Sequence, residues 1–112
     1  MSKHGFMVQK HFLMPTAWQA TFTHGNGGRT IGINSEMDAL PGIGHACGHN
    51  LIAISGVGVA CAIKAVMENF DIPGKILVLG TPGTYVSDKI VCINVLSNDR
   101  SGGRRVWESY PA

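Results

Sequence analysis

Apolar and polar residues alternate in the first part of the chain in the way that is typical of β-strands. The segment "GFMVQKHF" (5–12) alternates loosely. The segment "TAWQATFTHG" (16–25) places Trp18, Ala20 and Phe22 at every second position. Because successive side chains of a strand point to opposite faces, this period of two predicts two strands.

A third strand is predicted over "TIGINSEMDAL" (30–40), after the turn "HGNGGR". This turn could close a hairpin between the strand at 16–25 and the new one. The third strand becomes acidic toward its end, at Glu36 and Asp38. Open α/β sheets bind ligands at the carboxyl ends of their strands, so we expect these carboxylates at a ligand-binding edge.

The pattern then changes to that of a helix followed by a buried strand. Residues 51–70 are apolar at helical spacing, and Asn50 is a plausible N-cap. Small residues such as Gly56 and Ala60 would let a neighbouring strand approach closely. The run "KILVLGTP" (75–82) is continuously apolar, as is typical of a buried parallel strand. The order from residue 30 predicts a βαβ unit in a mixed sheet, an α/β fold.

Composition excludes several classes of partner. Charged residues make up only 14% of the 112 residues, against about 25% in an average domain, so much of the surface is expected to be covered. The net charge is +2 with no basic cluster beyond Arg104 and Arg105, which argues against nucleic acid. The apolar stretch 51–63 is too short for a membrane span, which needs about 20 residues. Three cysteines without a visible signal peptide predict free thiols and a cytoplasmic location.

The glycine-rich loop "GIGHACGHN" (42–50) contains candidate metal ligands. Cys47 and His49 lie two residues apart, and in an extended segment their side chains would point the same way. A thiolate and an imidazole suit zinc first, and manganese or cobalt less well. His45 could be a third ligand or a donor to one. The alternative is a glycine-rich turn whose histidines only form hydrogen bonds with the backbone.

Glu36 and Asp38 could act together with this loop. If the intervening residues fold back, a carboxylate would contact a ligand imidazole, which would fix its tautomer and raise its basicity. The alternative is two solvated carboxylates at a strand end.

The stretch "NSEMDALPGIGHACGHNLIA" resembles peptidase family M20, the metal-dependent aminoacylases, dipeptidases and amidohydrolases, and is most similar to the amidohydrolase branch. The segments "HFLMPTAWQATF" and "KILVLGTP" match in the same order, so the resemblance covers about residues 5–82. It implies a zinc-peptidase-like catalytic domain with two zinc or manganese ions. The implied substrates are small molecules, dipeptides or N-acyl amino acids, whose amide bonds are cleaved.

The resemblance also implies roles for individual residues. Cys47 and His49 match the two metal ligands of the family's "HACGH", with Cys47 placed to bridge two ions. Asp38 matches the acidic catalytic-site residue of "DMDALP", which supports the metal site without being a principal ligand. The family hydrolyses amides with metal-activated water and a glutamate general base.

The chain departs from the family after Gly83. The family continues "GTP" with "AEEGGGGK", whereas this chain reads "GTPGTYVSDK", and no histidine follows His49. A counterpart of the family's lid domain is also absent from the sequence. We therefore interpret residues 1–83 as a partial metallohydrolase domain, and 84–112 as an atypical tail from an unspliced intron or shifted frame. Such a fragment is expected to be inactive alone.

Two other classes of function stay open. The chain could be a non-catalytic binding or regulatory module that pairs with a full-length relative through exposed strand edges, or a homo-oligomer. It could also be a non-functional fragment that folds poorly because its sheet and helix lack covering layers.

Overall fold

The computed structural model describes residues 1–83, 85–86 and 89–90. The predicted atypical tail at 84–112 therefore lies largely outside the described residues. The elements in chain order are a 3-10 helix η1 (Ser2–His4), the strands β1 (Met7–Lys10), β2 (Trp18–His24) and β3 (Arg29–Glu36), the helix α1 (His49–Asn69), and the strands β4 (Gly74–Thr81), β5 (Tyr85–Val86) and β6 (Lys89–Ile90).

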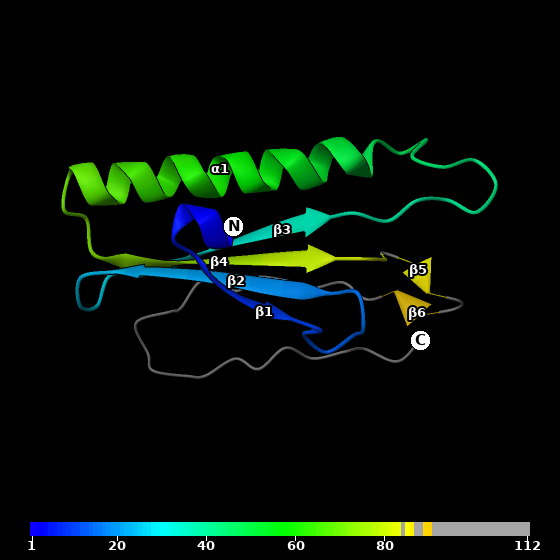
Figure 1. Ribbon diagram of the computed structural model, residues 1–112. Helices are drawn as coiled ribbons and strands as arrows, with labels where there is room; N and C mark the ends of the chain where they lie inside the picture. The colour runs from blue at the N-terminus through cyan, green and yellow to red at the C-terminus, as the bar shows by residue number, and fades with distance from the viewer. Residues whose placement is uncertain (84, 87–88, 91–112) are drawn as a thin grey trace.

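Four strands form one mixed sheet in the order β1-β2-β4-β3. β4 runs parallel to β3 and antiparallel to β2, and β1 pairs antiparallel with β2. The helix α1 connects β3 to β4 and lies along one face of the sheet (Figure 1). The predicted α/β class, mixed sheet and βαβ unit are therefore confirmed for the described residues.

The predicted hairpin between 16–25 and 30–40 is wrong, because β4 lies between β2 and β3. Val78 is the partner of Ala20 on one side and of Ile33 on the other. The apolar run of β4 explains this order. Its residues are buried on both faces, as Val78 and Leu79 show, and a strand of that kind is most stable at the centre of a sheet. The more polar β3 occupies the edge instead.

The core lies between α1 and the sheet. Its buried cluster consists of Phe6, Ala20, Ala60, Met67, Ile76 and Val78. The predicted close approach of a strand to the helix is confirmed at Gly56, where an added Cβ would lie 3.1 Å from Cβ of Ser35. The Ser35 hydroxyl donates to the Ala53 carbonyl of α1 at 2.9 Å. This contact ties the end of β3 to the first turns of the helix.

The outward face of α1 is apolar and exposed. Leu51, Ile54, Val59 and Val66 are among its exposed side chains. By length and composition alone α1 would suffice to cross a membrane, a test that core helices of globular proteins also pass. A helix that is apolar all round is typically covered on more than one side. The prediction that the chain has no membrane partner remains a prediction.

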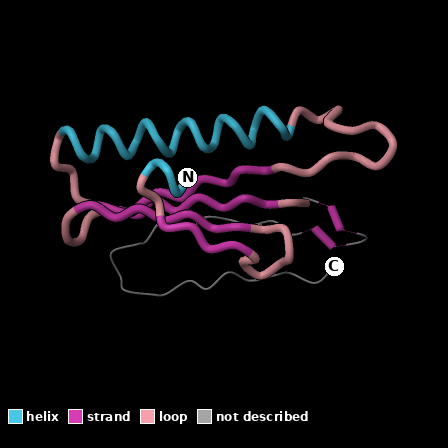
Figure 2. Tube along the Cα trace, in the orientation of Figure 1, coloured by secondary structure: helices cyan, strands magenta, loops and turns pink. Residues whose placement is uncertain are grey.

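The loop between β3 and α1 extends beyond the end of the sheet (Figure 2). β3 ends at Glu36, earlier than predicted, and α1 begins at His49, earlier than predicted. The N-cap is Gly48 and not Asn50. Gly48 has φ of 75°, a left-handed conformation that glycine adopts without strain, and its carbonyl accepts from the N–H groups of Leu51 and Ile52.

Candidate metal centre

Three potential ligands meet where β3 ends and α1 begins. Glu36 is the last residue of β3, Asp38 follows two residues later, and His49 is the first residue of α1. Glu36 is also the partner of Thr81, the last residue of β4, so the group lies at the carboxyl edge of the parallel pair. The carboxylates therefore occupy the edge at which the sequence predicts a ligand site.

The imidazole of His49 lies between the two carboxylates. Its Nδ1 is 2.6 Å from Oδ1 of Asp38, and its Nε2 is 3.4 Å from Oε2 of Glu36. The side chains of His49, Asp38 and Glu36 are 16%, 15% and 28% exposed, so the group is shielded from water but reachable. The predicted contact between a carboxylate and the His49 imidazole is confirmed.

The Asp38 contact determines which nitrogen of His49 is available. An ionised carboxylate only accepts hydrogen bonds, so Nδ1 must carry the proton that it donates to Asp38. In the neutral ring the lone pair is then on Nε2, which faces Glu36. This is the arrangement in which a metal-binding histidine is oriented by a carboxylate behind it.

Two further polar side chains support Glu36, and the sequence pattern alone did not point to them. The Asn34 amide donates from Nδ2 to Oε1 of Glu36 at 3.1 Å. The Thr81 hydroxyl donates to Oδ1 of Asn34 at 3.0 Å. The spacing of two between Asn34 and Glu36 on one strand is a signal that could have placed them on the same face.

Cys47 and His45 are not part of this group of three. Both are exposed, and residues 45–48 form a turn in which the Gly48 N–H donates to the His45 carbonyl at 3.0 Å. The expectation of an extended segment that aims Cys47 and His49 the same way is therefore wrong. The glycines turn the backbone here, and His49 already belongs to the helix. The roles of Cys47 and His49 as metal ligands stay predictions.

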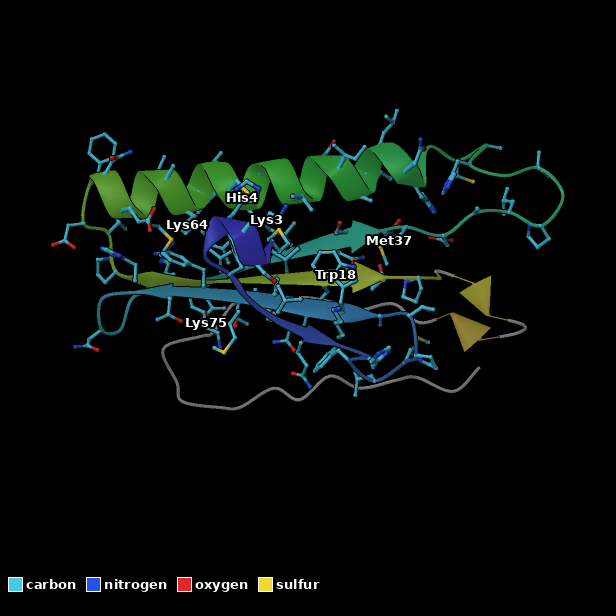
Figure 3. All side chains as sticks on the ribbon, viewed as in Figure 1. Lys3, His4, Trp18, Met37, Lys64 and Lys75 are labelled. Carbon is cyan, nitrogen blue, oxygen red and sulfur yellow. The ribbon has the colours of Figure 1, made fainter. Side chains whose placement is uncertain are left out.

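Trp18 contributes to the site from β2. Its indole N–H donates to Sδ of Met37 at 3.3 Å, and the two side chains lie together near the end of β4 (Figure 3). The backbone N–H of Met37 donates to the Thr81 carbonyl at 2.9 Å. Met37 separates Glu36 from Asp38, so these contacts fix the segment that carries both carboxylates. Trp18 is therefore a packing residue that also holds Met37 in place.

The group fits a divalent cation. His49, Glu36 and Asp38 each offer one ligand atom, and these atoms lie within 4.8 Å of one another. Imidazole nitrogen and carboxylate oxygen are ligands of zinc, and carboxylates also suit manganese. The donors therefore agree with the divalent metal that the family resemblance implies.

Among known proteins, the chain is similar to two dipeptidases and one hydrolase subunit. No family model matches the chain. The Xaa-Arg dipeptidases of Mus musculus and Homo sapiens are 44% and 41% identical to it over 82 and 86 residues. One of the subunits of the p-aminobenzoyl-glutamate hydrolase of Escherichia coli (strain K12) is 31% identical over 97 residues.

These alignments cover 67% of this chain for the two dipeptidases and 70% for the bacterial hydrolase subunit, but only 19% to 20% of each relative. The chain therefore spans about a fifth of the length of the curated relatives it matches. Over that part, the similarity to two dipeptidases and a hydrolase subunit supports the resemblance to peptidase family M20.

Proposed function

We propose that this chain is a segment of a metal-dependent hydrolase of peptidase family M20, whose substrates are dipeptides or N-acyl amino acids. The observation that carries the proposal is the contact between Asp38 and His49, which orients an imidazole at the carboxyl edge of the sheet. The names of the similar proteins, two dipeptidases and an amide hydrolase, support the reaction class. Zinc and manganese are the proposed metals.

In this function His49 and Cys47 would hold the cation. A divalent cation supplies Lewis-acid polarisation of the amide carbonyl and activation of water. Asp38 keeps the proton of His49 on Nδ1 and so presents Nε2 to the site. The partial burial of His49, Asp38 and Glu36 would strengthen the electrostatic interactions among these three side chains.

We infer that the chain has negligible activity on its own. The family's paired glutamates after "GTP" have no counterpart in "GTPGTYVSDK". Loss of a general base typically costs about 10²- to 10⁴-fold in rate. A site without that group would bind the metal but hydrolyse amides very slowly. The predicted cytoplasmic location stays part of this proposal.

Replacing Cys47 with serine tests whether the exposed thiol binds the metal. We expect the full chain to bind Zn²⁺ or Mn²⁺ in a competition titration with a chromophoric chelator. The Cys47→Ser variant should bind at least about 10-fold more weakly, because a hydroxyl is a poorer ligand than a thiolate. The same samples should show no detectable hydrolysis of a dipeptide that ends in arginine.

Cys61→Ser is the matched control, because Cys61 is a free thiol on α1 that packs against the core, away from the loop. Its metal affinity should equal that of the unmodified chain. Equal affinities for all three proteins would remove Cys47 from the ligand set. No metal uptake by the unmodified chain would contradict the proposed function.

A second candidate function is a non-catalytic module that associates through its apolar surface. The exposed side chains on the outward face of α1 favour it, because contiguous exposed apolar surface commonly marks an interface. β1 and β3 also form the two edges of the four-stranded sheet, and strand edges can pair with another chain.

Sedimentation velocity of the full chain tests this second function. We expect concentration-dependent self-association that the Ile54→Lys substitution on α1 reduces several-fold, because a charge on this face must be desolvated on binding. Ile43→Lys is the control, since Ile43 lies in the loop and both isoleucines are 70% exposed. A chain that stays monomeric at all concentrations, or equal effects of the two substitutions, would argue against association through α1.

A further inference from the structure

We propose that Glu36 is itself a metal ligand, and that Asn34 and Thr81 are positioning residues that aim it at the cation. This role rests on the proposed metal-dependent function and extends it to residues outside the "HACGH" motif. The four side chains form one continuous series: Thr81 contacts Asn34, Asn34 contacts Glu36, and Glu36 faces His49.

The first argument is the pair of atoms that face each other across the site. The Nδ1 of His49 is bonded to Asp38, so its Nε2 is the ring nitrogen that faces the site. The atom opposite is Oε2 of Glu36. An imidazole nitrogen and a carboxylate oxygen that face each other are both ligand atoms for a divalent cation. The arrangement therefore suits a positive ion at this point.

The second argument is the separation of these two atoms. Nε2 of His49 and Oε2 of Glu36 are 3.4 Å apart, which is longer than an ordinary N–H···O hydrogen bond. Two ligand atoms bound to one tetrahedral zinc ion, each about 2.0–2.2 Å from the metal, are about 3.3–3.5 Å apart. The observed distance corresponds to that of two ligands of a common ion.

The third argument is that Glu36 is prepared for this role. Its Oε1 accepts from Asn34, so only Oε2 remains directed at His49. The carboxylate cannot donate, so the NH₂ end of the Asn34 amide must face it, and the Asn34 oxygen must then face Thr81. The Thr81 hydroxyl meets that need by donating, from a residue that is only 8% exposed. The orientation of every group follows from its neighbour.

The test measures the Zn²⁺ affinity of the full chain by chelator competition, with the melting temperature of the metal-free protein as a second measurement. Glu36→Gln should raise the Kd for Zn²⁺ at least about 10-fold. It should not lower the melting temperature, because the glutamine amide can still accept from Asn34 and can donate to Nε2 of His49. A loss of affinity without a loss of stability separates a ligand from a structural residue.

The positioning role is tested at Thr81. Thr81→Val keeps the shape of the side chain but removes the hydroxyl, and should weaken Zn²⁺ binding by about 10-fold. Thr81→Ser should restore it. Glu68→Gln is the matched control for Glu36→Gln, because Glu68 pairs with Lys64 on α1. The Zn²⁺ affinity of this control should equal that of the unmodified chain.

The outcomes distinguish the two levels of the proposal. If the unmodified chain binds Zn²⁺ and Glu36→Gln binds it equally well, Glu36 is not a ligand, while the proposed function stands. If Thr81→Val lowers only the melting temperature, Asn34 and Thr81 are structural and do not position Glu36. If the unmodified chain takes up no Zn²⁺, both the ligand role and the proposed function are overturned.

Discussion

Replacing His49 with alanine should abolish the binding of zinc and manganese, with a Kd at least about 100-fold higher than that of the unmodified chain. The imidazole lies between both carboxylates of the site, at 2.6 Å from Asp38 and 3.4 Å from Glu36. Loss of an outer partner of a ligand typically costs about 10- to 100-fold in affinity, so loss of a direct ligand should cost no less. Isothermal titration with each metal measures the effect.

His24→Ala is the matched control for this experiment. Nε2 of His24 is 2.8 Å from Oδ1 of Asp71, so both histidines pair with an aspartate. His24 is the partner of Gly74 at the start of β4, whereas the candidate site lies at the end of β4. The control should bind metal as the unmodified chain does. Equal losses in the two variants would point to a general effect of removing a histidine and would contradict the site.

Gly80→Ala should lower the free energy of unfolding by about 1–3 kcal/mol, the range typical of overpacking. A Cβ at Gly80 would overlap the indole of Trp18, its partner on β2. Trp18 cannot move aside without cost, because its ring packs against the core and its N–H donates to Met37. Urea unfolding followed by circular dichroism gives the free energy of unfolding. The hydrogen bond from Trp18 to Met37 should be lost in the Gly80→Ala variant.

Gly58→Ala is expected to have the opposite effect on the free energy of unfolding in the same assay. Gly58 lies within α1, and apart from the adjoining backbone of the helix itself, a Cβ there would meet no atom of the described residues within 4 Å. Because alanine favours a helix over glycine by about 1 kcal/mol, this variant should be slightly more stable than the unmodified chain. If the two variants had the same free energy of unfolding, the indole of Trp18 would not be packed against β4 as described.

Local patterns predicted the elements well, because each depends on residues close together in the chain. The period of two placed β2, and the long apolar run placed α1 to within two residues at its start and one at its end. The small residue Gly56 correctly indicated a close strand, and the acidic end of 30–40 correctly indicated carboxylates at the carboxyl edge of the parallel pair.

The pairing of strands that are distant in the chain was harder to predict from the sequence. The hairpin prediction failed because the turn at 24–29 fits either a hairpin or a wider connection, and only the strongly apolar β4 decides between them. The site was predicted in part: Asp38 and His49 are in contact, but Asn34 and Thr81 were not identified. Their role depends on the register between β3 and β4, which a single strand's pattern does not contain.

The position of β4 also sets the order in which the sheet can be completed during synthesis. β4 is the last of the four strands to be made, yet it lies between β2 and β3. Until the ribosome has released Thr81, only β1 and β2 of this sheet can be paired as they finally are. β3 cannot pair in this sheet, and α1 cannot pack on the complete sheet, before β4 has been synthesised. Pairings between strands far apart in the sequence generally form slowly. A nascent chain of this kind exposes its apolar helix until β4 has paired, which makes this interval the one in which a chaperone would be most useful.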